Sequence, residues 1–66
     1  MQNYYNILGL DKNCSQKDIR EAYKKYALKY HPDKNNNDQI YLKKFIDISN
    51  AYEILSDKKK RKEYDL

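Results

Sequence analysis

Two stretches of helical periodicity, one on each side of a single proline, limit this chain to few folds. In the first, apolar residues fall at positions 19, 22, 23, 26, 27 and 30, which lie on one face of a helix. In the second, positions 41, 45, 48, 52 and 55 hold the spacing of an a/d seam, which suits antiparallel packing. Pro32 ends the first stretch because it lacks a backbone N–H and keeps His31 out of the α region. The pattern predicts two long antiparallel helices joined by a loop.

Capping residues predict two further, shorter helices, one at each end of the chain. Asn3 is placed to cap a first helix, and Gly9 can adopt the left-handed conformation that ends it. Ser15 opens the second helix with Asp18 as a shortened capping box, and Ser56-Asp57 caps the last helix. The predicted helices span residues 4–8, residue 15 to Pro32, residues 38–55 and residues 58–64. We expect one all-α domain over residues 1–66, an antiparallel two-helix hairpin with a short helix at each end.

The composition excludes several classes of protein. Valine is absent and glycine and proline occur once each, which favours helices over a small β-sandwich or barrel. One cysteine (Cys14) and one histidine (His31) supply neither an internal disulfide nor a four-ligand zinc site. No signal peptide is recognisable, and no apolar run approaches the roughly 20 residues of a membrane span. We therefore expect a cytoplasmic protein that is too small for a self-contained enzyme pocket and holds no cofactor or metal.

The tripeptide His31-Pro32-Asp33 forms a rigid, solvent-facing corner in the predicted loop between the long helices. Proline fixes the backbone, histidine offers two ring nitrogens, and aspartate offers a carboxylate that can accept from an arginine or lysine. As a catalytic base, His31 lacks both a nucleophile and a second histidine. Basic and aromatic side chains of the second helix stand beside the corner: Arg20, Tyr23 and Lys24. This combination predicts a surface that docks on a partner of mixed charge.

These residues belong to a longer pattern that resembles the J domain, the module that defines the DnaJ, or forty-kilodalton heat-shock, family of co-chaperones. The resemblance covers nearly the whole chain and rests on five motifs: Tyr4-Tyr5-x-Ile7-Leu8-Gly9, Ile19-Arg20-x-Ala22-Tyr23, Ala27-Leu28-Lys29-Tyr30-His31-Pro32-Asp33-Lys34, Lys44-Phe45-x-x-Ile48-x-x-Ala51-Tyr52-x-x-Leu55-Ser56-Asp57 and Lys60-Arg61-x-x-Tyr64-Asp65. The tripeptide alone is a moderate motif, and the flanking pattern in register makes it a strong one.

The resemblance implies a partner rather than a substrate. A J domain binds a seventy-kilodalton heat-shock chaperone of the DnaK class and stimulates its ATP hydrolysis when a client protein is engaged. This chain would then be an activator in trans, with the hydrolysis chemistry on the chaperone. By position, His31, Pro32 and Asp33 are the indispensable loop, and Asp33 pairs with an arginine of the chaperone. The other residues implied at the interface are Arg20, Tyr23, Lys24, Lys25, Lys34 and Asn35.

Client proteins would bind through regions that this chain does not contain. A Gly/Phe-rich linker, a zinc-binding cysteine repeat and a client-binding region are all missing from the 66 residues. The chain therefore looks like a J domain excised from a longer co-chaperone, and we expect it to be a monomer by itself.

Several positions depart from the common family pattern. Tyr26 stands where a core leucine is usual, so its ring needs space and its hydroxyl needs a partner or solvent. Glu21 takes a position that is often basic and thins the positive face of the second helix. Ile46 stands near the loop where a lysine is common, and Leu28 and Leu42 also point away from the seam. These apolar groups suggest a second contact surface, such as one with the rest of a parent protein.

A small helical nucleic-acid binder is the main alternative, suggested by the net charge of +4, the eight tyrosines and the lysine clusters. A helix-turn-helix joins its helices by about 3–4 residues, whereas the loop from His31 to Asn37 has seven. Only two arginines are available for guanine readout, and the tripeptide would have no purpose. We therefore expect no nucleic-acid partner. A folded but inactive J domain is a further alternative, against which the intact tripeptide argues.

Three other features of the sequence are interpreted separately. The run Lys58–Lys62 can be solvated, pair with acidic groups of a parent protein, or contact phosphate, and the sequence leaves these open. Helical spacing predicts that most of a tyrosine stripe lies in the core: Tyr23, Tyr26, Tyr30, Tyr41 and Tyr52. Cys14 is interpreted as a packing or spacer residue.

Overall fold

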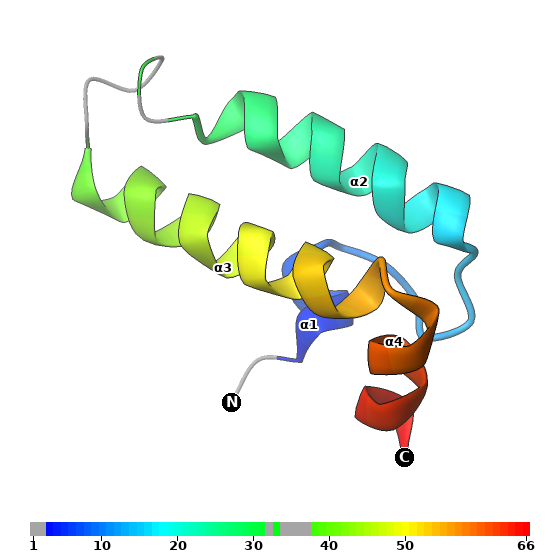
Figure 1. Cartoon of the computed structure of the whole chain (residues 1–66). Helices are drawn as coiled ribbons and strands as arrows, with labels where there is room; N and C mark the ends of the chain where they lie inside the picture. The colour runs from blue at the N-terminus through cyan, green and yellow to red at the C-terminus, as the bar shows by residue number, and fades with distance from the viewer. Residues whose placement is uncertain (1–2, 32, 34–37) are drawn as a thin grey trace.

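The computed structural model describes residues 3–31, 33 and 38–66, and over these residues the regular structure is entirely helical (Figure 1). The helices are α1 (Tyr4–Ile7), α2 (Gln16–Lys29), α3 (Gln39–Leu55) and α4 (Lys58–Asp65). Helices α2 and α3 form an antiparallel hairpin, α1 packs against α3, and α4 turns away from the C-terminal end of α3. This arrangement confirms the predicted fold class. Across the described ranges, no helix has both the length and the apolar character needed to cross a membrane.

Each helix begins at a residue whose side-chain oxygen accepts a backbone N–H from the first turn: Asn3, Ser15, Asp38 and Asp57. The cap of α2 is a full capping box. The Ser15 hydroxyl accepts from the N–H of Asp18 at 3.0 Å, and the Asp18 carboxylate accepts from the N–H of Ser15 at 3.1 Å. The predicted helix starts are therefore confirmed to within one residue, because capping depends on local sequence.

The helix ends agree less closely with the prediction. Helix α1 stops one residue early because Leu8 is its C-cap, and Gly9 follows in the expected left-handed conformation with φ of +66°. Helix α2 stops at Lys29, with Tyr30 as its C-cap, so it ends before the predicted boundary. Pro32, to which that boundary was assigned, lies outside the described residues. Helix α4 runs one residue further than predicted.

The core is aliphatic rather than tyrosine-rich. Its buried members are Tyr5, Leu8, Ile19, Ile48, Ala51 and Leu55. The expectation that the tyrosine stripe lies mostly in the core is confirmed only in part, because four of its five rings pack against the core without being fully buried. The rings of Tyr23, Tyr26, Tyr30 and Tyr52 are half-buried, and Tyr41 is exposed. They line the edges of the hairpin and contact one another, because a phenol hydroxyl is costly to remove from water while the ring packs well.

Tyr26, which stands where the family pattern has leucine, finds its space against Gly9. A β-carbon built on Gly9 would lie 2.9 Å from the Tyr26 hydroxyl, so the absence of a side chain there makes room for the larger ring. The ring also lies nearly parallel to that of Tyr30, at 6.2 Å between centroids. Gly9 is thus required both for its backbone conformation and for this contact.

Arg61 anchors α4 to the connection between α1 and α2. Its guanidinium donates to the hydroxyl of Tyr5 at 3.0 Å, to the side-chain oxygen of Gln16, and to the carbonyls of Lys12 and Cys14 at 3.2 and 2.6 Å. The run of five basic residues is therefore not a uniform solvated surface. Its one arginine faces inward and satisfies backbone carbonyls that no helix satisfies.

Candidate docking site

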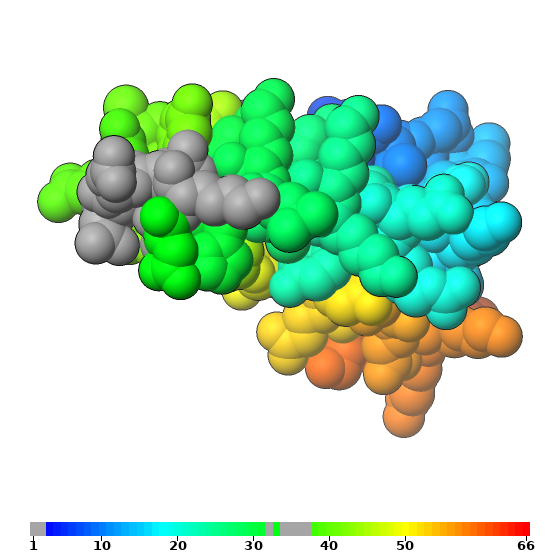
Figure 2. All heavy atoms as spheres, turned by 90° about the horizontal axis from the view of Figure 1, so that it is seen from above, coloured from blue at the N-terminus to red at the C-terminus, as the bar shows by residue number. Residues whose placement is uncertain are grey.

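The predicted site residues lie along α2 and at the loop end of the hairpin. Figure 2 shows this face, with α2 running along it from cyan to green and the described residues of the loop in green at one end. His31 and Asp33 follow the C-cap of α2 and therefore stand where the hairpin turns (Figure 1). Pro32, Lys34 and Asn35, which the sequence analysis assigned to the same site, lie outside the described residues.

His31 is oriented by contacts on two sides. Its ring meets the ring of Phe45 edge to face, at 5.7 Å between centroids and 74° between planes. Its Nδ1 accepts a hydrogen bond from the backbone N–H of Asp33 at 3.2 Å. The same nitrogen lies 3.8 Å from an Asp33 carboxylate oxygen. An imidazole that is held by α3 on one side and by the loop backbone on the other presents a defined surface to a partner.

Asp33 presents an acceptor to solvent. Its side chain is 88% exposed, and the contact with His31 at 3.8 Å is too long for a hydrogen bond. A carboxylate in this setting can accept two parallel hydrogen bonds from a guanidinium. The loop therefore offers a ready contact for an arginine of another protein.

The basic residues of α2 do not all share one face. Arg20 and Lys24 are four residues apart in α2, so the two lie on one side of the helix axis, and His31 follows the C-cap of the same helix. Both cations are exposed, and neither has an ion-pair partner in the described part of the chain. Lys25 lies further round the helix, with its ammonium 5.6 Å from the ring centre of Tyr26. Arg20 and Lys24 thus share one side of α2, and Lys25 lies on its flank.

Tyr23 connects the site to the scaffold. Its ring stacks on that of Tyr52 from α3, at 4.1 Å between centroids and 17° between planes. The ring is half-buried, so one side holds the two long helices together while the other remains accessible. Tyr23 is therefore a structural residue as well as a candidate contact.

Glu21 thins the positive face of α2, as the sequence indicated. Its carboxylate lies 4.0 Å from the ammonium of Lys17, and both side chains are well exposed. An exposed pair of this kind contributes little to stability, and salt screens it further. Its main effect is to remove Lys17 from the set of unpaired cations near the site.

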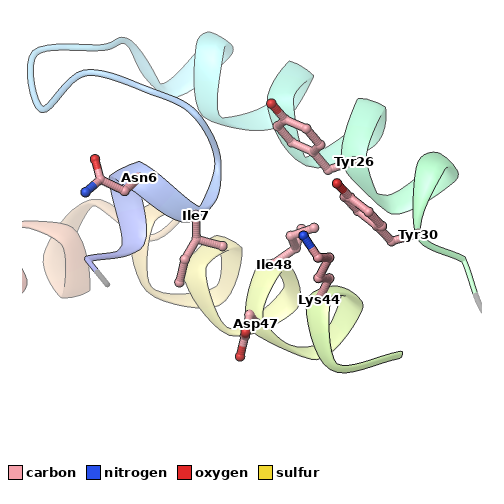
Figure 3. A pocket seen from close by; sticks show the side chains of 7 residues that line it. All are labelled: Asn6, Ile7, Tyr26, Tyr30, Lys44, Asp47 and Ile48. Carbon is pink, nitrogen blue, oxygen red and sulfur yellow. The ribbon is translucent and has the colours of Figure 1, made fainter. Parts of the chain in front are cut away.

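The candidate site is an open surface and lies apart from the hollow between the helices. Within residues 3–31, 33 and 38–66, no group of three or more His, Cys, Asp or Glu side chains is placed to hold a metal ion. The hollow in Figure 3 has a volume of about 240 Å³ and includes neither His31 nor Asp33. It is lined by residues of α1, α2 and α3: Asn6, Ile7, Tyr26, Tyr30, Lys44, Asp47 and Ile48. The site is thus an open surface, with a carboxylate at the loop end of α2 and two exposed cations along the same helix.

Sequence reasoning missed one residue of this site. Phe45 was assigned to the seam between the long helices, yet its ring also supports His31. The helical spacing of Phe45 with the other seam residues does not indicate this second contact, because the contact depends on how the loop folds back onto α3. The inward position of Arg61 was missed for a similar reason, since its neighbours in sequence are all lysines.

Comparisons with known proteins agree with the sequence motifs. The sequence model of the DnaJ domain matches residues 3–65. Two relatives are bacterial proteins named chaperone protein DnaJ. The one from Clostridium kluyveri is 52% identical and the one from Treponema denticola 53% identical, each over 64 residues that make up 97% of this chain. The rice DnaJ protein ERDJ3A (Oryza sativa subsp. japonica) is 56% identical over 62 residues, or 94% of this chain.

A solved structure shares the fold. The crystal structure of the J-Trx1 fragment of ERdj5 superposes with a TM-score of 0.90 and 49% sequence identity, over 98% of this chain and 31% of that chain. This chain spans 17% of the length of the two bacterial proteins and 10% of the rice protein. The similarity therefore concerns one domain of longer proteins.

Proposed function

The chain belongs to the DnaJ domain family, whose J domains generally serve as the co-chaperone module for seventy-kilodalton heat-shock chaperones, and from this premise we propose that it stimulates such a chaperone's ATPase. J domains of this family are regulators of a chaperone rather than enzymes. In this proposal the hydrolysis chemistry stays on the chaperone. The domain acts by binding the hydrolysis-competent arrangement of the chaperone more tightly than the resting one, which shifts the population toward hydrolysis.

The exposed carboxylate of Asp33 beside the oriented ring of His31 is the observation that best supports this proposal. Asp33 would accept hydrogen bonds from an arginine of the chaperone. Arg20 and Lys24, which lie on the same side of α2, would face an acidic surface of the chaperone. The remaining proposed contacts follow the family motif: Tyr23, Lys25, Pro32, Lys34 and Asn35.

The wider role follows from the same premise. We propose that this domain works within a longer co-chaperone whose other regions bind client proteins, so that a client and the chaperone meet at one molecule. The domain itself would act as a monomer. A cytoplasmic location stays a prediction from the sequence, because the relatives include both bacterial DnaJ chaperones and ERDJ proteins.

Single-turnover ATP hydrolysis by a DnaK-class chaperone, with a client peptide present, tests the proposal. The rate is measured with the chaperone alone, with the wild-type domain and with His31→Gln. We expect acceleration by the wild-type domain and none by the variant. Glutamine has no ring to meet Phe45 edge to face and no ring nitrogen to accept the backbone N–H of Asp33. A wild-type domain that leaves the rate unchanged with its cognate chaperone and client would favour a folded but inactive J domain.

A further inference from the structure

Two exposed apolar side chains of α3 lie beside the candidate docking site. Leu42 is 39% exposed and Ile46 is 50% exposed. They are four residues apart and therefore lie one above the other on the same stripe of the helix. Leu42 is also three residues before Phe45, whose ring contacts His31. Neighbouring side chains thus run from His31 through Phe45 to Leu42 and Ile46.

No other described helix covers this stripe. Figure 1 shows α4 at the C-terminal end of α3 and α1 toward its C-terminal half, while α2 runs beside the first turns of α3, next to the loop. Leu42 and Ile46 are in these first turns and lie to one side of the seam that faces α2, which runs through Tyr41, Phe45 and Ile48. Single exposed aliphatic residues are ordinary on protein surfaces. An exposed apolar pair that adjoins a proposed interface belongs to that interface if its footprint is wide enough to reach the pair.

The size of a protein interface places this stripe within reach of the partner. A stable interface covers about 800 Å² on each partner, and a circular footprint of that area is about 32 Å across. The hairpin is narrower, since the extents of the chain are 37, 23 and 17 Å. The axes of packed helices lie only about 8–10 Å apart. A partner that engages Asp33 and Lys24 together therefore extends over the adjoining turns of α3.

We propose that Leu42 and Ile46 extend the docking site onto α3 and select a chaperone that presents an apolar surface beside its acidic one. This inference rests on the proposed function and adds the chemistry of the partner's surface to it. The family pattern commonly has a lysine at position 46, which would favour an acidic surface there. In this chain Ile46 gains by burial against apolar atoms instead.

A matched pair of substitutions in α3 tests the inference. Ile46→Lys places a charge on the stripe. Ile40→Lys makes the same chemical change at a residue that is 66% exposed and shares its stripe with Lys44 and Asp47, which line the hollow in Figure 3. Each variant gains one positive charge, so long-range attraction to an acidic partner changes equally in both. Circular dichroism verifies that both variants keep the helical content of the wild type.

The readout is stimulation of the cognate DnaK-class chaperone, the one that this domain is proposed to select, as a function of domain concentration. We expect Ile46→Lys to raise the concentration for half-maximal stimulation about tenfold, with the maximal rate unchanged, and Ile40→Lys to match the wild type. Equal curves for the two variants would overturn the inference while leaving the proposed function intact. So would a wild-type dimer in size-exclusion chromatography that Ile46→Lys dissociates, because the stripe would then serve self-association. A wild-type domain without stimulation would overturn the proposed function itself.

Discussion

Individual residues of this small domain differ greatly in how far they can be changed, and Gly9 is among the least tolerant. A left-handed φ costs other L-residues about 1–2 kcal/mol, and a β-carbon here would also press on the Tyr26 hydroxyl at 2.9 Å. We predict that Gly9→Ala lowers the free energy of unfolding by about 1–3 kcal/mol in urea denaturation. In a Tyr26→Phe background the hydroxyl is absent, so the loss should be smaller. An equal loss in both backgrounds would contradict the contact.

Tyr5 makes the stability of the domain depend on pH in the alkaline range. Burial, and after it the hydrogen bond that Tyr5 donates to Asp65 at 2.6 Å, raise the pKa of its phenol above the ordinary value of 10.0. The folded state therefore holds this proton more tightly than the unfolded state does. The resulting stabilisation is fully present below pH 10.0 and is lost as the pH rises through the raised pKa.

The corresponding experiment compares wild type with Tyr5→Phe by thermal unfolding at increasing pH. We predict that the difference in Tm between them narrows above pH 10.0, because the wild type alone loses the stabilisation. A difference that stays constant across this range would show that the phenol proton does not contribute.

At the scale of elements, Arg61 contributes several of the hydrogen bonds that hold α4 to the domain. We predict that Arg61→Met lowers the free energy of unfolding by about 2–3 kcal/mol, because the carbonyls of Lys12 and Cys14 lose their donor. Amide hydrogen exchange within α4 should become faster as well. Lys62→Met, which removes the neighbouring exposed charge, is the control and should change stability little. Equal effects of the two substitutions would contradict the anchoring role of Arg61.

Helix α2 has a different role in our proposal, which is to present cations to the chaperone. Lys24→Glu reverses a charge that has no partner in the described residues. We predict a higher domain concentration for half-maximal stimulation of the chaperone and a flatter dependence on salt, since the charge contributes through screened attraction. Lys62→Glu makes the same reversal on α4 and should leave both quantities unchanged. If Lys24→Glu behaved like this control, α2 would not belong to the interface.

Helix starts and the antiparallel hairpin were predictable from the sequence, and individual tertiary contacts were not. The helix starts follow from Asn3, Ser15 and Asp57, because a cap involves only the first turn of its own helix. The support of His31 by Phe45 joins a loop to a distant helix, and no periodicity encodes it. The depth of the tyrosine rings was not predictable, because helical spacing gives the side of a helix on which a residue lies and not how deeply a large ring with a polar tip is buried.

In the whole molecule, the residues that stabilise the fold lie apart from those that we propose contact the chaperone. The buried core joins α1, α2 and α3 away from the loop, with α4 anchored nearby, whereas His31 and Asp33 stand at the opposite, loop end of the hairpin (Figure 1). Changes to the loop should therefore leave the helices intact. This separation lets one substitution test function without testing folding.

The most direct test of the central claim compares two carboxylates in the stretch between α2 and α3. Asp33→Asn removes the exposed charge of the loop, while Asp38→Asn removes a charge from the cap of α3, where asparagine caps equally well. Single-turnover ATP hydrolysis by a DnaK-class chaperone is measured with each variant, alongside circular dichroism. Our account predicts that Asp33→Asn loses stimulation with its helical spectrum unchanged and that Asp38→Asn retains stimulation. Full stimulation by Asp33→Asn would contradict it.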